Sequence, residues 1–105
     1  RENRVWIISD LAYSELYYDG NPTVSILQVK GAKDVAIEFT SLSKTFSMAG
    51  WRIGFAVGNR DLIAAMTRVK SYLDYGAFTP IQAAACAALN GPQDIIESNR
   101  QLYHK

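Results

Sequence analysis

A short polar turn joins two apolar runs in the middle of the chain, and this arrangement restricts the fold more than any other feature. The runs, residues 35–40 and 52–57, are rich in β-branched and aromatic residues and predict strands. The connection over residues 40–51 is too short for a helical crossover, so the second strand is predicted to run antiparallel to the first. An earlier apolar run, Val5 to Ser9, predicts a buried strand. The pattern therefore predicts an α/β fold with a mixed sheet.

Three helices are predicted after these strands. Asn59 can cap a helix over residues 60–72. Its apolar residues recur on one face: Leu62, Ile63, Met66, Val69 and Leu73. Thr79 as N-cap and Pro80 in the first turn begin an alanine-rich helix, and Gly91-Pro92 separates it from a more polar last helix. Helices are thus expected to flank the sheet.

Three local features are assigned ordinary structural roles. The run Gly54-Phe-Ala-Val-Gly58 is interpreted as a strand that tolerates its glycines. Cys86 lies in an alanine-rich run, which favours a small buried thiol over a nucleophile or a metal ligand, and no second cysteine exists to pair with it. His104, the only histidine, is expected to face solvent. No metal site is predicted.

The polar turn itself brings together side chains with complementary chemistry. It holds Ser41, Ser43, Lys44 and Arg52. A lysine amine can attack an aldehyde when it is unprotonated, an arginine fork matches phosphate oxygens, and a serine adds a hydroxyl. This combination can hold a phosphorylated aldehyde.

Taken singly, the candidate residues have simpler interpretations. Lys44 and Arg52 alone would most often be solvated surface charges. Asp10 would more often cap a turn, Tyr13 would pack half-buried, and Ser41 would make a local hydrogen bond. Only the joint pattern favours a site over these alternatives.

That joint pattern resembles the lysine site of fold-type I pyridoxal-phosphate enzymes, specifically the class I/II aminotransferases. The matching elements are a serine, any residue, a small residue and the lysine, followed by Gly50 and Arg52. The resemblance implies that Lys44 is the catalytic residue and forms a Schiff base with pyridoxal 5'-phosphate. It also implies that Ser41 and Arg52 hold the phosphate, with Ser43 in the same cofactor-binding group.

An Asp-x-x-Tyr element upstream, Asp10 to Tyr13, matches the same family. Asp10 follows an apolar run, so its carboxylate is expected at the carboxyl end of a strand, where open α/β sheets bind ligands. The resemblance implies that Asp10 binds the pyridine nitrogen and that Tyr13 binds the phenolic oxygen of the cofactor.

Within this family the chain looks most similar to bacterial alanine aminotransferases and LL-diaminopimelate aminotransferases. An amino acid and a 2-oxo acid are therefore the expected substrates, with alanine and 2-oxoglutarate favoured. A sister fold-type I lyase or synthase and a non-catalytic interaction module remain alternatives. The resemblance further implies a cytoplasmic homodimer that acts in amino-acid metabolism.

Length and charge set further expectations. Residues 1–105 are expected to form part of the large, cofactor-binding domain, with the last helix leading toward a small domain. The chain lacks an initiator methionine and closes inside a helical pattern, so an internal fragment, by itself inactive, is expected. A net charge of +1 favours no nucleic-acid partner, and the apolar runs are too short to cross a membrane.

Overall fold

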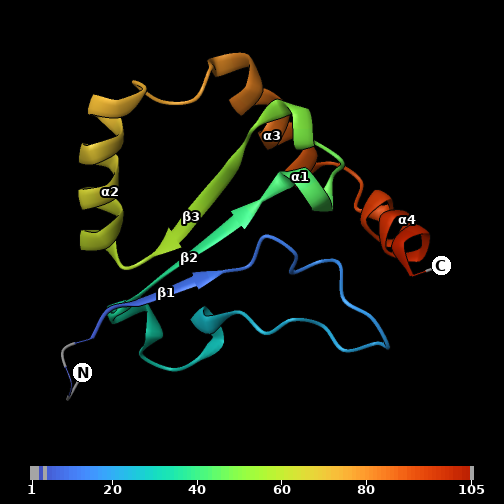
Figure 1. Cartoon of the computed structure of the whole chain (residues 1–105), viewed down its shortest axis with the longest axis horizontal. Coiled ribbons are helices and arrows are strands. Elements are labelled where there is room, and N and C mark those ends of the chain that lie inside the picture. The colour runs from blue at the N-terminus through green and yellow to red at the C-terminus, as the bar shows by residue number, and fades with distance from the viewer. Residues whose placement is uncertain (1–2, 4, 105) are drawn as a thin grey trace.

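A three-stranded sheet forms the centre of the computed structural model, which describes residue 3 and residues 5–104. Its strands are β1 (Ile7–Asp10), β2 (Ala36–Ser41) and β3 (Gly54–Gly58). β2 is central and pairs parallel with β1 and antiparallel with β3. Figure 1 shows β1 and β2 pointing toward the same end of the molecule and β3 returning. The predicted mixed sheet is confirmed.

The two parallel strands differ in burial. β2 begins with three buried residues, Ala36 to Glu38. The expectation that the first strand is buried is wrong for the described residues, because Ile8 is 74% exposed and Ile7 is 39% exposed. β1 lies at the edge of the sheet, so only one neighbouring strand covers it.

Short helical turns connect the strands. They are η1 (Ile26–Gln28), η2 (Ala32–Asp34), α1 (Leu42–Thr45) and η3 (Ala49–Trp51). η1 begins after Ser25, whose side chain accepts a hydrogen bond from the Leu27 amide. α1 and η3 lie between β2 and β3, so the link between these antiparallel strands contains only single turns.

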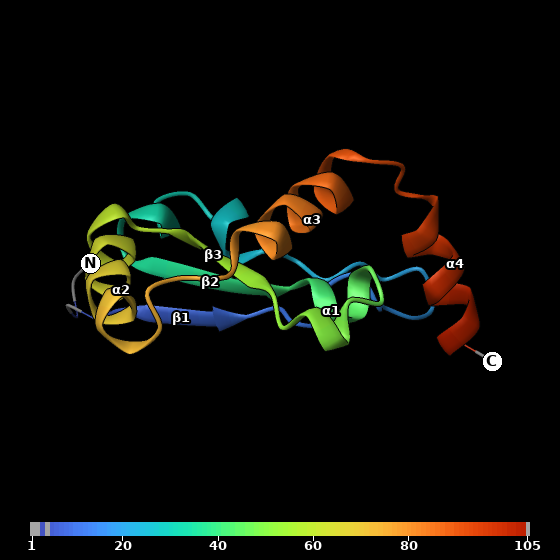
Figure 2. The same ribbon diagram turned by 90° about the horizontal axis from the view of Figure 1, so that it is seen from above.

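Three longer helices complete the fold: α2 (Arg60–Leu73), α3 (Thr79–Asn90) and α4 (Asp94–Tyr103). The predicted cap of α2 is confirmed, because the Asn59 side chain accepts hydrogen bonds from two amides of its first turn. α3 begins one residue earlier than predicted, with Phe78 at its N-cap. α2 stands at the opposite end of the sheet from α1 (Figure 1), and α3 lies on one side of the sheet (Figure 2).

A small apolar core packs α3 against the segment that follows β2. Its buried members are Leu42, Met48 and Ala85, and its partly buried members are Phe46, Ile53, Ala84 and Ala88. The prediction of a buried Cys86 is wrong, because this thiol is exposed. One residue advances about 100° around a helix, so Cys86 lies off the face on which Ala84, Ala85 and Ala88 meet the core.

The two glycines of β3 are required rather than tolerated. A Cβ atom added to Gly54 would lie 2.5 Å from the Thr40 carbonyl oxygen, and one added to Gly58 would lie 2.3 Å from the Ala36 carbonyl oxygen. Gly58 also has a φ of 146°, which side chains disfavour. The predicted strand over residues 54–58 is confirmed, but its glycines are more than tolerated, since the backbone of β2 approaches too closely for a side chain.

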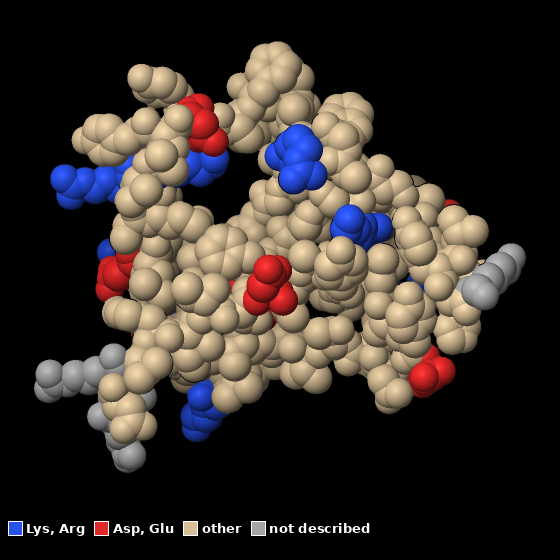
Figure 3. Space-filling model, viewed as in Figure 1, with Lys and Arg blue, Asp and Glu red and all other residues tan. Residues whose placement is uncertain are grey.

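Large apolar side chains remain on the surface around the end of α2. Val69 and Leu73, predicted on its apolar face, are exposed, and so are Tyr72 and Tyr75. Figure 3 shows charged side chains spread thinly over one face, with broad uncharged areas between them. Surfaces of this kind are typical of regions that other protein segments cover. None of the described helices is both long and apolar enough to cross a bilayer.

Candidate active site

The candidate site lies at the end of the sheet where both parallel strands finish. Asp10 is the last residue of β1 and is paired with Phe39 of β2. The next amide, that of Leu11, donates to the Phe39 carbonyl at 2.9 Å. Ser41 is the last residue of β2, and α1 follows it directly. The parallel pairing therefore brings both sequence motifs to the end of the sheet where β1 and β2 finish, as Figure 1 shows.

The side chains of Lys44 and Tyr13 lie next to each other at this end of the sheet. Lys44 lies on α1 and is partly buried, and its Nζ atom is 5.5 Å from the centroid of the Tyr13 ring. Both side chains border a hollow of about 420 Å³, which is also lined by Leu16, Tyr18 and Tyr103. This volume falls in the range of small-molecule pockets. The fold thus places the predicted catalytic amine beside an aromatic ring and an open space.

Ser41 has a structural role as the N-cap of α1. Its Oγ accepts a hydrogen bond from the Ser43 amide at 3.2 Å, which satisfies one of the unpaired amides of the first turn. The hydroxyl keeps its own proton for a further acceptor. Ser43 takes part in this contact through its backbone, and its side chain is partly buried.

Arg52 is held near the same edge by the closure of the turn. Ser41 pairs with Gly54, and the Leu42 amide donates to the Ile53 carbonyl at 3.2 Å. Arg52 has a left-handed backbone, with a φ of 53°, and its Nη1 donates to the Ala49 carbonyl at 2.9 Å. A guanidinium has five N–H donors, so this contact leaves donors that can face an anion.

The Asp10 carboxylate makes a local turn contact. Its Oδ1 accepts a hydrogen bond from the Ala12 amide at 3.2 Å, as the simpler interpretation of this residue predicts. A carboxylate has about four acceptor positions, so the same group can accept a further N–H. Asp10 is exposed at the strand end, and with Tyr13 it borders a second hollow of about 300 Å³.

Sequence reasoning missed a residue that touches the lysine turn from a distant helix. Asn99 of α4 is buried, and its Nδ2 donates to the Thr45 carbonyl at 3.0 Å. The two residues are 54 positions apart. Because no local pattern marks such a contact, only the packing of α4 could reveal it.

These residues fit pyridoxal 5'-phosphate by the chemistry of their donors. Lys44 offers an amine, Asp10 a carboxylate, Tyr13 a phenol, and Ser41 and Arg52 offer phosphate donors, all at one edge of the sheet. Fold and site together define an α/β unit with a lysine at the carboxyl end of the parallel strands of a mixed sheet.

Comparison with known proteins identifies the family. The chain matches the family described as "Aminotransferase class I and II" over residues 1–105. It is 54% identical to the glutamate-pyruvate aminotransferase AlaC of Escherichia coli (strain K12) over 101 residues, covering 96% of this chain and 24% of that protein. It is 52% identical to an LL-diaminopimelate aminotransferase of Aquifex aeolicus (strain VF5) over 105 residues, covering 100% and 27%.

Solved structures agree with this match. The crystal structure of an aspartate aminotransferase from Rhizobium meliloti superposes with a TM-score of 0.91 at 38% identity, covering 98% of this chain and 26% of that one. The chain belongs to the class I and II aminotransferase family. It spans about a quarter of the length of the relatives that it matches.

Proposed function

We propose that the protein to which this chain belongs, called the full-length protein below, transfers an amino group between an amino acid and a 2-oxo acid with pyridoxal 5'-phosphate as cofactor. The observation that carries this proposal is the position of the Lys44 amine, 5.5 Å from the Tyr13 ring at the edge where β1 and β2 end. Membership of the aminotransferase family supports it. A cytoplasmic homodimer stays a prediction from the family resemblance.

When bound, pyridoxal phosphate supplies an aldehyde and an electron-withdrawing pyridine ring. Asp10 would hold the proton on the pyridine nitrogen, and the Tyr13 hydroxyl would donate to the ring oxygen. Ser41 and Arg52 hold the phosphate through charge-assisted hydrogen bonds. The Lys44 amine would hold the cofactor through its aldehyde and would move a proton to and from the substrate α-carbon.

For the substrates we propose alanine and 2-oxoglutarate, with LL-diaminopimelate as the alternative amino donor. Relatives named for each reaction have nearly the same identity to this chain, 54% and 52%. This chain covers about a quarter of each relative, and the family resemblance implies that most groups contacting the substrate side chain lie outside it. An assay is therefore needed to distinguish the two amino donors.

The test uses the full-length protein incubated with 2-oxoglutarate and each amino donor in turn. Glutamate and pyruvate are the expected products with alanine, whereas release of ammonia would indicate a lyase and contradict the proposal. Lys44→Ala is expected to abolish transfer and the visible absorbance of the bound cofactor. Lys33→Ala is the matched control, because Lys33 is exposed on η2. If Lys44→Ala kept both properties, the enzyme interpretation would fail.

A further inference from the structure

The turn that follows Lys44 has little internal support. α1 is a single turn of four residues, and an isolated turn of this length is not stable by itself. The amides of Phe46 and Met48 both donate to one carbonyl, that of Leu42, at 3.1 and 3.4 Å. Ser47 between them has a φ of 55°, a conformation that serine adopts only when the surroundings hold it there. The direction of the Lys44 side chain therefore depends on contacts from outside the turn.

Asn99 of α4 supplies such contacts. This residue is 7% exposed. The Nδ2 atom donates to the Thr45 carbonyl at 3.0 Å, and the Oδ1 atom accepts from the Ser47 hydroxyl at 3.4 Å. One amide group thus binds both sides of the turn that follows Lys44. Buried hydrogen bonds of this kind fix geometry, because breaking them leaves polar groups without partners.

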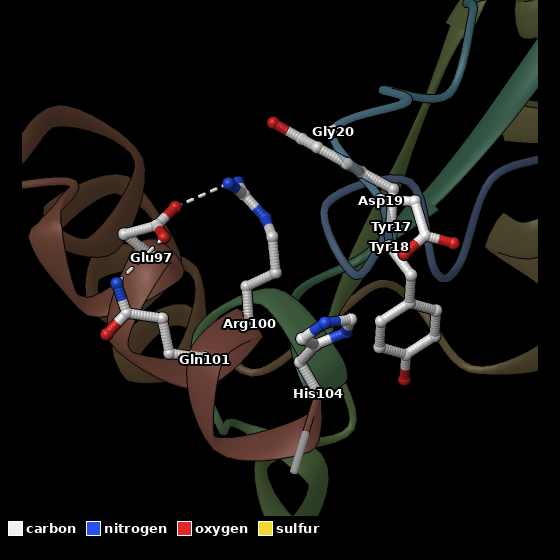
Figure 4. A pocket seen from close by; sticks show the side chains of 8 residues that line it. All are labelled: Tyr17, Tyr18, Asp19, Gly20, Glu97, Arg100, Gln101 and His104. Atoms are coloured by element: carbon white, nitrogen blue, oxygen red, sulfur yellow. Dashed lines mark hydrogen bonds and ion pairs between the residues drawn. The ribbon is translucent and has the colours of Figure 1, made fainter.

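The next residue on α4 contacts the other half of the site. Arg100 Nε donates to the Glu15 carbonyl at 3.1 Å, and the guanidinium lies 4.0 Å from the centroid of the Tyr17 ring. Figure 4 shows this arginine between the α4 residue Glu97 and residues 17–20. Residues 15 and 17 follow Tyr13 closely in the chain. α4 is therefore attached both to the segment that carries Tyr13 and to the turn that carries Lys44.

We propose that Asn99 is a positioning residue for Lys44, and that its buried amide holds α1 so that the lysine amine faces the cofactor aldehyde beside Tyr13. This inference rests on the proposed function. Displacing a reacting group by about 1 Å can cost on the order of 100-fold in rate. Loss of the Asn99 amide should therefore slow the attack of Lys44 on the aldehyde carbon, a reaction in which a C=N bond replaces the C=O bond, and the oxygen leaves as water with the two amine hydrogens.

The test compares two ligands on the cofactor-free full-length protein. Pyridoxal phosphate reacts with the lysine amine, whereas pyridoxamine phosphate has the same ring and phosphate but no aldehyde. The variants are Asn99→Leu, which removes the amide, and Asn99→Asp, which keeps the shape and the acceptor but loses the donor to Thr45. Asn90→Leu is the control, because the Asn90 amide binds the Cys86 carbonyl on the exposed part of α3.

In both Asn99 variants we expect the rate of covalent capture of pyridoxal phosphate, followed by absorbance, to fall about tenfold or more. The affinity for pyridoxamine phosphate should stay unchanged, and the amides of Phe46 and Met48 should exchange hydrogen faster. If the affinity for pyridoxamine phosphate fell by as large a factor as the capture rate of pyridoxal phosphate, Asn99 would have a general structural role and the inference would be overturned. Capture at the unsubstituted rate in Asn99→Asp would also overturn it. Absence of a Lys44 adduct in the unsubstituted protein would instead overturn the proposed function.

Discussion

The Lys44 ammonium lies 5.5 Å from the centroid of the Tyr13 ring, within the distance of a cation–π contact. The Tyr13 ring therefore faces the lysine, and its hydroxyl is available for a different partner. In the proposed site that partner is the phenolic oxygen of the cofactor. The ring and the hydroxyl can be tested separately.

Tyr13→Phe keeps the ring beside Lys44 and removes only the hydroxyl. We expect kcat to fall by about 10- to 100-fold, the value of one hydrogen bond to a charged group. The unfolding midpoint should not change, because Tyr13 is exposed. Steady-state kinetics and thermal unfolding of the full-length protein test this. Tyr72→Phe, also exposed and remote from α1, is the control. A large change in stability with unchanged kcat would contradict the assignment.

Ser41 combines a helix cap with a proposed phosphate contact, and two substitutions separate these roles. Ser41→Ala should destabilise the lysine turn by about 1 kcal/mol through loss of the cap. Ser41→Asp should keep the cap, since aspartate caps as well as serine, but its charge should repel the phosphate.

The affinity for pyridoxal phosphate should therefore be lower in Ser41→Asp than in Ser41→Ala, although the aspartate variant is the more stable. Titration calorimetry and thermal unfolding of the full-length protein give both quantities. An aspartate variant that bound the cofactor at least as tightly as the alanine variant would exclude Ser41 from the phosphate site.

Asp74 gives the chain a local dependence on pH. The Lys70 side chain, which donates to its carboxylate at 2.5 Å, lowers the pKa of Asp74 below 3.8, and the Gly76 amide lowers it further. A carboxyl whose pKa is lower in the folded state stabilises that state above its ordinary pKa. This contribution is lost as the pH falls from about 3.8 through the folded value.

An NMR titration of Asp74 should therefore show a midpoint below 3.8, and Lys70→Met should raise it. Arg60→Met, at the other end of α2, should leave it unchanged. A midpoint that does not respond to the loss of Lys70 would show that this ion pair does not form in solution.

Much of the fold follows from local sequence signals. The two strands that flank the lysine turn were predictable because their apolar residues cluster between polar segments, and the short link between them dictated antiparallel pairing. The helix starts at Asn59 and near Thr79 were predictable because caps and prolines act within one turn. Asp10 was expected at a strand end, and the structure has it there.

The remaining features depend on distant parts of the chain. The exposure of β1 follows from its place at the sheet edge, and the exposure of Cys86 follows from which face of α3 meets Leu42. Asn99 contacts Thr45, which is 54 positions away in the sequence, so the residues around Asn99 do not predict this contact. Tertiary packing decides such features.

Gly58 should be intolerant of any side chain. A Cβ atom there would lie 2.3 Å from the Ala36 carbonyl oxygen, and the φ of 146° is itself unfavourable. We expect Gly58→Ala to destabilise the protein by about 2–4 kcal/mol, as strain and a backbone clash act together. Gly50→Ala is the control, since a Cβ there meets open space. Urea unfolding of the full-length protein measures both, and equal stability of the two variants would show that β2 and β3 are farther apart.

Glu38 of β2 is a buried carboxylate that binds Ser25 and Ile26, at the start of η1, to the sheet. It is 5% exposed and accepts hydrogen bonds from the Ser25 hydroxyl at 2.8 Å, from the Ile26 amide at 2.9 Å and from the Ser9 hydroxyl at 3.4 Å. Glu38→Gln replaces one acceptor oxygen with an NH₂ group that faces donors. We expect it to lower the free energy of unfolding by about 1–3 kcal/mol.

A double-mutant cycle with Ser25→Ala tests whether this network is real. Ser25→Ala alone removes a donor to the carboxylate, so it should also destabilise the protein. If the two groups bind each other, the double variant should lose less than the sum of the single losses, by about 0.5 kcal/mol or more. Urea unfolding of the full-length protein supplies the three values. Strictly additive losses would mean that Ser25 and Glu38 act independently and that something else anchors η1.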